Sequence, residues 1–140
     1  MSVDGAGALG NVRPLQPARV VLTGRDKRFV KVAGFLLARR GFQVSHVTSE
    51  GELTQLADKG GVDVVVLDAT WSLSSSLRTA AALSALHPHV QILLATEANA
   101  SRLESTYRQI DKWRGLGTLA DEVAFAQLGL SMESSQPEAG

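Results

Sequence analysis

The stretch Val62-Asp63-Val64-Val65-Val66-Leu67-Asp68 decides the fold class of this chain. A run this rich in β-branched, apolar residues is typical of a central strand in a parallel sheet that is covered on both faces. In such sheets, ligands and chemistry gather at the carboxyl ends of the strands. The run ends in a carboxylate, so Asp68 is the first candidate for a functional group.

Segments of strand and helix character alternate on both sides of this run. Strands are expected at Arg19–Thr23, Phe42–Val47, Val62–Asp68, Val90–Thr96 and Arg108–Trp113. Helices are expected at Lys27–Arg40, Ser49–Lys59, Leu73–Leu86, Asn99–Tyr107 and Leu116–Leu128. This alternation predicts an α/β fold with an open, doubly wound parallel sheet and helices on both faces. Five strands suit the flavodoxin-like arrangement, a three-layer αβα sandwich with strand order 2-1-3-4-5.

Capping residues mark several helix boundaries. Ser49 followed by Glu52 fits a capping box at the start of the second helix. Gly41 is expected to end the first helix, and Ser72 or Ser74 to cap the third. In the 2-1-3-4-5 order the strand order reverses between the first and third strands, so the candidate site lies at their tips.

Composition bounds the class of protein. The chain has 140 residues, of which 44% are hydrophobic, and this is enough for one domain with a real core. We expect that domain at residues 19–129, between a flexible arm at 1–18 and a disordered tail at 130–140. The formal net charge is zero, which disfavours nucleic-acid binding. Without cysteine, a signal peptide or a membrane-length apolar run, the sequence indicates a soluble cytoplasmic protein with no membrane partner.

Three segments together resemble the receiver domain of bacterial two-component response regulators. They are Ala38–Val44, Val62–Asp68 and His87–Thr96, and the resemblance covers about residues 18–129. It implies phosphoryl transfer from a kinase onto one Asp, which forms an acyl phosphate, with Mg²⁺ neutralising the phosphate charge.

Carried over residue by residue, the resemblance assigns roles to three side chains. Asp68 resembles the phospho-acceptor, and Thr96 resembles the hydroxyl that contacts the phosphoryl group after the fourth strand. Lys112 resembles the lysine that follows the fifth strand, although Trp113 stands where the family usually has Pro.

The acidic pair that holds Mg²⁺ in the family is the main departure. Its two positions fall on Gly24 and Arg25, and Asp26 comes one residue later. If Mg²⁺ binds at all, Asp26 and Asp68 are the expected ligands; otherwise no cofactor is expected. An arginine close to Asp68 would keep the carboxylate ionised and repel Mg²⁺. We therefore hypothesise that Arg25 replaces the metal and that Asp68 is phosphorylated weakly or not at all.

These features predict a stand-alone, atypical receiver domain, or pseudo-receiver, in phosphorelay signalling. It is not expected to be an enzyme and would act by binding a protein, either a histidine kinase or another signalling protein, with a homodimer as a further option. The family's usual contact face would here include Tyr107, Trp113, Leu116 and Leu119.

Two other classes stay open. A cobalamin-binding domain shares the expected fold but would need an Asp-x-His-x-x-Gly run, and the chain has neither His nor Gly at those positions of the segment Asp26–Lys31. A scaffold module without any ligand site is the other alternative. Fold analogy alone does not decide between functions.

Overall fold

The computed structural model describes residues 17–70, 72–97 and 107–128. Its strands are β1 (Arg19–Thr23), β2 (Gln43–Val47), β3 (Val64–Asp68), β4 (Gln91–Thr96) and β5 (Arg108–Asp111). Its helices are α2 (Lys27–Arg39), α3 (Glu50–Asp58), α4 (Leu73–Leu86), the 3₁₀ helix η2 (Arg114–Thr118) and α5 (Leu119–Gln127). Most of the expected arm, all of the tail at 130–140 and residues 99–106 of the helix expected at Asn99–Tyr107 lie outside the described residues.

The strands form one parallel sheet in the order β2-β1-β3-β4-β5, and this confirms the predicted topology. β3 lies at the centre, and all five of its residues are buried. In the register, Val66 of β3 stands between Leu22 of β1 and Leu93 of β4. The apolar run that ends in Asp68 is therefore the middle strand of the sheet, with helices over both faces.

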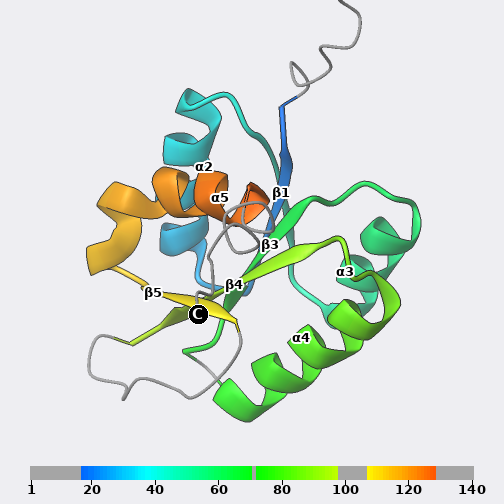
Figure 1. Cartoon of the computed structure of the whole chain (residues 1–140). Helices are drawn as coiled ribbons and strands as arrows, with labels where there is room; N and C mark the ends of the chain where they lie inside the picture. Colours follow the sequence, from blue (N-terminus) through cyan, green and yellow to red (C-terminus); the bar gives the residue numbers. More distant parts are fainter. Residues whose placement is uncertain (1–16, 71, 98–106, 129–140) are drawn as a thin grey trace, which may run out of the picture.

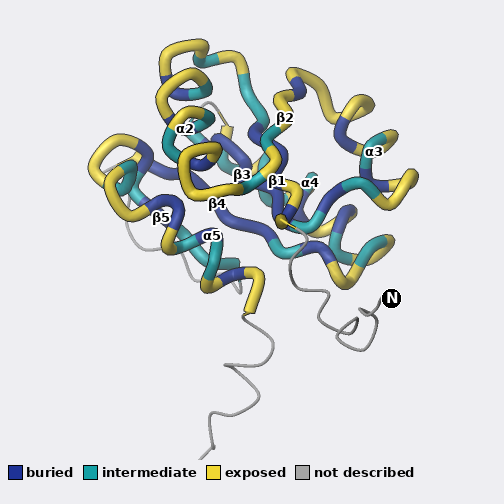
Figure 2. The backbone as a smooth tube through the Cα atoms, turned by 90° about the horizontal axis from the view of Figure 1, so that it is seen from above, coloured by how far each residue is buried: buried dark blue, intermediate teal, exposed yellow. Residues whose placement is uncertain are grey.

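Two hydrophobic clusters fill the space on either side of the sheet. Figure 1 shows helices over both faces of the sheet, and Figure 2 shows β3 and β4 mostly in the colour of buried residues. Helices α2 and α5 cover one face, where Phe29 and Leu119 are fully buried. Helices α3 and α4 cover the other face, where Leu53 and Leu83 pack on the sheet. The result is the predicted three-layer sandwich.

The capping signals in the sequence are largely confirmed. The Ser49 hydroxyl accepts a hydrogen bond from the Glu52 N–H at 3.1 Å, and the Glu52 carboxylate accepts one from the N–H of Thr48 at 2.9 Å. Ser72, rather than Ser74, caps α4 by accepting from the N–H of Ser75. These bonds satisfy N–H groups that a helix start leaves without partners.

The last helix begins later than predicted. The chain turns after β5 because one oxygen of Asp111 accepts hydrogen bonds from the N–H groups of Trp113 and Arg114. The following turn contains Gly115 and Gly117, which weaken an α-helix, and it forms the 3₁₀ helix η2 instead. Within the part of the chain that the structure describes, no helix combines the length and apolar character needed to cross a membrane.

Candidate functional site

Two carboxylates and one ammonium meet at the carboxyl edge of the sheet. The Lys112 Nζ atom lies 2.7 Å from Oδ2 of Asp26 and 2.8 Å from Oδ2 of Asp68. Asp26 follows β1, Asp68 ends β3 and Lys112 follows β5, so three loops that are far apart in the sequence build the cluster. The predicted grouping of Asp68 with Lys112 is present, and Asp26 belongs to it.

Lys112 is held in an enclosed position. Its backbone N–H donates to the Thr96 carbonyl at 2.8 Å, which extends the β4–β5 pairing by one residue. Its Nζ atom lies 5.4 Å from the ring centre of Phe29 and 5.6 Å from that of Trp113. The side chain is only 6% exposed. Burial lowers the pKa of Lys112, but hydrogen bonding and attraction to Asp26 and Asp68 outweigh it, so the net pKa is raised above its usual range.

Asp26 has two structural roles at once. Its Oδ1 atom caps α2 by accepting the N–H groups of Arg28 and Phe29, each at 3.2 Å. Its Oδ2 atom contacts Lys112. The bond with Lys112 and the cap bond from Phe29 both lower the pKa of Asp26, so the carboxylate stays ionised.

Asp68 is buried, and each of its oxygens has a described neighbour. Oδ1 accepts the N–H of Thr70 at 3.0 Å and also the Thr70 hydroxyl. Oδ2 contacts Lys112 at 2.8 Å as an ion pair, and it accepts no well-aligned hydrogen bond from a described residue. The Asp68 backbone N–H donates to the Thr23 hydroxyl at 3.3 Å. The carboxylate is thus fixed by the segment that follows it and by Lys112.

Gly24 approaches Asp68 so closely that a side chain at this position would be crowded. A Cβ built on Gly24 would lie 3.1 Å from the Cβ of Asp68, and the φ angle of Gly24 is +118°. The Nε2 atom of His46 donates to the Gly24 carbonyl at 2.8 Å and holds this turn against β2. One position of the family's acidic pair is therefore occupied by a glycine whose backbone conformation and surroundings disfavour a side chain.

Thr96 lies at the same edge but faces a different partner. Its buried hydroxyl donates to the Ile110 carbonyl at 3.3 Å. Among the described contacts, none joins this hydroxyl to Asp68. The assignment of Thr96 as a phosphate contact stays a prediction.

The structure corrects two expectations for individual residues. Lys112, and not Arg25, is the cation beside Asp68; Arg25 is exposed and forms no ion pair with a described carboxylate. The long side chain of Lys112 starts just after β5 and extends along the carboxyl edge of the sheet to Asp68. On the expected contact face, Leu119 is fully buried in the core and is unavailable to a partner. Trp113 is exposed at 47%, while Leu116 is only partly exposed.

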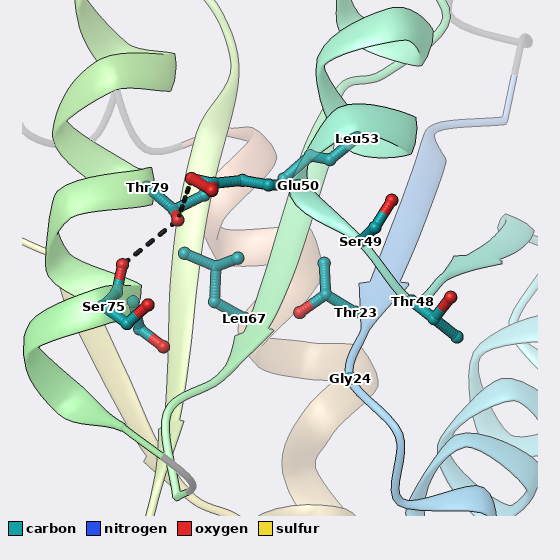
Figure 3. A pocket seen from close by; sticks show the side chains of 10 residues that line it. Thr23, Gly24, Thr48, Ser49, Glu50, Leu53, Leu67, Ser75 and Thr79 are labelled. Carbon is teal, nitrogen blue, oxygen red and sulfur yellow. Dashed lines mark hydrogen bonds between the residues drawn. The ribbon is translucent and has the colours of Figure 1, made fainter.

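A cavity of about 210 Å³, lined largely by hydroxyl side chains, lies beside the end of β1 on the α3–α4 side of the sheet (Figure 3). The Thr79 hydroxyl donates to the Glu50 carboxylate at 2.6 Å and bridges the two helices. A second cavity overlaps this one at Gly24 and Thr48 and reaches Arg25 and Asp68. This second cavity reaches the neighbourhood of Asp68, but the Asp68 side chain itself is fully buried.

The donor set does not fit a resident Mg²⁺. This ion needs near-octahedral oxygen coordination, with one or two carboxylates as protein ligands. The two oxygens of Asp26 and the two of Asp68 already contact N–H, hydroxyl or ammonium groups. Among the described residues, no three His, Cys, Asp or Glu side chains gather where they could hold a metal.

Sequence reasoning missed two members of the site. Thr70 connects Asp68 to Lys112, since its hydroxyl donates to Asp68 and accepts from Lys112 at 3.2 Å. Phe29 provides a wall for the ammonium. A threonine two residues after a strand-end Asp was a usable signal, because such a residue can close a local turn on the carboxylate. Nothing local in the sequence marks Phe29 as anything but core.

Comparison with known proteins shows likeness in structure only. No family model matches the sequence, and no curated protein matches it. A response regulator receiver domain protein from Clostridium thermocellum is 17% identical, with a TM-score of 0.68 over 82% of this chain and 98% of that one. An orphan response regulator of H. pylori is 16% identical, with a TM-score of 0.64 over 79% of this chain and 96% of that one.

A protein from Burkholderia pseudomallei described as pilus assembly-related is 20% identical, with a TM-score of 0.63 over 79% of this chain and 89% of that one. Most of the similar structures are receiver domains, and their cores superimpose on this one over most of its length. The chain has the receiver fold. At these identities the likeness shows the fold alone, and the receiver fold here carries an ion-paired Asp68 at its switch point.

Proposed function

We propose that the chain is an atypical receiver module in phosphorelay signalling that acts by binding a protein partner, with Asp68 phosphorylated weakly or not at all. The observation that carries the proposal is the Lys112 ammonium between the carboxylates of Asp26 and Asp68. A cation of the chain itself therefore neutralises both carboxylates that could otherwise hold a metal.

The ion pair opposes metal binding on electrostatic grounds. At an effective dielectric near 20, two unit charges about 2.8 Å apart attract by roughly 6 kcal/mol before desolvation is subtracted. Mg²⁺ would have to displace Lys112 from Asp68 and lose its own hydration, with a single second carboxylate, Asp26, to compensate. Gly24 adds to the effect because it supplies no ligand.

The same contacts disfavour catalysis by Asp68 or Lys112. A nucleophilic carboxylate needs an accessible oxygen, and both oxygens of Asp68 are engaged. Lys112 stays protonated, because its pKa is raised, and so it is a poor general base near neutral pH. These features support a non-enzymatic role through a protein contact, for which a histidine kinase or another phosphorelay protein is the class of partner that the resemblance suggests.

An amide NMR titration tests the proposal directly. Mg²⁺ is added first, and then beryllofluoride as a mimic of the acyl phosphate. We expect no saturable shifts at Asp68, Thr70 or Lys112. The Lys112→Met variant is the matched control: it frees the carboxylates, so Mg²⁺ should move the amides of Asp26 and Asp68 and prove that the assay can report binding. Saturable shifts in the unmodified protein would refute the proposal.

A further inference from the structure

The strongest charge asymmetry of the chain lies along α2. Residues 25–40 hold six of the 14 Lys and Arg residues but only one of the 14 Asp and Glu residues. The formal net charge of the whole chain is zero. A neutral protein therefore presents one strongly basic helix.

The outer stripe of α2 has an unusual composition. Spacings of three, four, seven and eleven residues place five side chains on one line along the helix. These side chains, all exposed, are Arg28, Lys31, Val32, Phe35 and Arg39. We call them the α2 stripe. It consists of three cations with two apolar side chains between them.

Both kinds of residue in the stripe are free to meet a partner. Phe35 is 60% exposed and Val32 is 40% exposed. The Arg39 guanidinium lies 5.7 Å from the centre of the Phe35 ring. Among the described residues, no carboxylate forms an ion pair with Arg28, Lys31 or Arg39.

Neighbouring acids do not cancel this charge. Asp26 is engaged by Lys112, and on α5, which covers the same sheet face, Asp121 pairs with Arg40 at 2.8 Å. The exposed acids Glu50 and Glu52 begin α3, which covers the opposite sheet face. The positive charge of the described domain is therefore concentrated at α2, and an external negative field would orient it with α2 forward.

We propose that the α2 stripe binds the surface of an anionic membrane, with Arg28, Lys31 and Arg39 at lipid phosphates and Phe35 in the headgroup region. Basic residues near an anionic leaflet attract it, each contributing about fivefold to partitioning. An exposed aromatic ring between cations suits the interface between water and acyl chains. This departs from the expectation that the protein has no membrane partner.

The shape of the surface favours a lipid partner over an acidic protein. The described cavities lie at the carboxyl edge of the sheet and between α3 and α4, and no residue of the α2 stripe lines them. A lipid surface needs no pocket to receive it. Membrane binding by the α2 stripe does not depend on whether Asp68 is phosphorylated, so this proposal and the proposed function can fail independently.

Vesicle sedimentation with the full chain tests the proposal. The probes are vesicles of phosphatidylcholine alone and of an equal mixture with phosphatidylglycerol. We expect binding to the mixture only, and release at about 1 M salt, where the Debye length is about 3 Å. The double variant R28E/K31E should bind at least about 20-fold more weakly, and F35S several-fold more weakly.

The variant R78E/R114E is the matched control, because it makes the same change in net charge at two exposed arginines outside α2. It should retain binding within about threefold. An equal loss of vesicle binding in both double variants would mean that only the net charge of the protein matters, and this would overturn the proposal. So would the absence of binding to the mixture, equal binding to phosphatidylcholine, or tighter binding of polyglutamate than of vesicles at the same salt. Circular dichroism confirms that each variant is folded.

Discussion

Gly24 lies so close to Asp68 that a Cβ on the glycine would come within 3.1 Å of the aspartate Cβ. Restoring an acid at this position should therefore fail to restore a metal site. We expect Gly24→Asp to lose about 1–3 kcal/mol of unfolding free energy, because the side chain meets both a strained φ of +118° and a steric contact. The same variant should gain no measurable Mg²⁺ affinity.

Gly41→Asp separates the two causes. Gly41 also has a positive φ, +97°, but a Cβ there would meet nothing within 4 Å. Gly41→Asp should therefore lose only the part of the unfolding free energy that comes from backbone strain. Urea denaturation of both variants gives the comparison. Equal losses, or Mg²⁺ binding by Gly24→Asp, would contradict the steric argument.

The sequence was sufficient for the sheet because its signals are local. The β3 run, the helix that follows each strand and the caps at Ser49 and Ser72 each depend on a few neighbouring residues. The strand order then follows from general rules of parallel sheets. The 3₁₀ start of the last helix was missed because Asp111 acts there through hydrogen bonds to the two N–H groups that follow it in the turn.

The site was harder to predict because its geometry depends on reach across the sheet edge. Asp68 could be named from its position at a strand end and Lys112 from the resemblance to receiver domains, but the counter-ion of Asp68 could not be chosen. Arg25 is adjacent to Asp26 in the sequence, yet it is the Lys112 ammonium that lies between Asp26 and Asp68. The rings of Phe29 and Trp113 pack around this ammonium, and such contacts between distant segments leave no local signal in the sequence.

Removing the Lys112 ammonium should destabilise the protein and make its thermal stability depend on Mg²⁺. Lys112→Met leaves the buried carboxylate of Asp68 without a charged partner, and breaking a buried pair costs about 3–5 kcal/mol. We expect a loss near the lower figure, because Asp26 is partly exposed. Mg²⁺ should restore part of the loss in thermal unfolding. Lys27→Met, at an exposed lysine, is the control and should change neither stability nor its response to Mg²⁺.

The decrease in unfolding free energy at low pH, here called the acid limb, should depend on Asp26. Its pKa in the folded protein is lowered, so its contribution is fully present above its usual value near 3.8 and is lost as the pH falls further. Lys112 has a raised pKa, so its contribution is present below about 10.5 and is lost at higher pH. Between these two pH limits, the Asp26–Lys112 ion pair should make a constant contribution to the free energy of unfolding.

The variant Asp26→Asn isolates the charge from the cap, since Asn caps helices as well as Asp does. It should lower stability at neutral pH and flatten the loss below pH 4, as measured by urea denaturation across the pH range. Asp63→Asn, which removes a different paired carboxylate, should leave the Asp26 part of the acid limb in place. An unchanged acid limb in Asp26→Asn would show that the Lys112 contact does not hold in solution.

Trp113 should contribute both to stability and to association. Its ring meets Phe29 edge to face at 5.8 Å and covers the Lys112 ammonium, yet it remains 47% exposed. We expect Trp113→Ala to lose about 1–2 kcal/mol of stability from these contacts. Exposed aromatic rings also dominate protein contacts, so the variant should associate more weakly with a partner or with a second copy.

Trp113→Phe and Phe125→Ala distinguish these two roles. The Phe variant keeps an aromatic ring near Phe29 and should recover most of the stability. Phe125 is also 47% exposed but belongs to α5, so its removal should leave an association through Trp113 unchanged. Sedimentation velocity over a concentration series and pull-down with a phosphorelay partner provide the measurements. If Trp113→Ala matches the unmodified protein in both, the ring serves only to enclose Lys112, and the partner surface lies elsewhere.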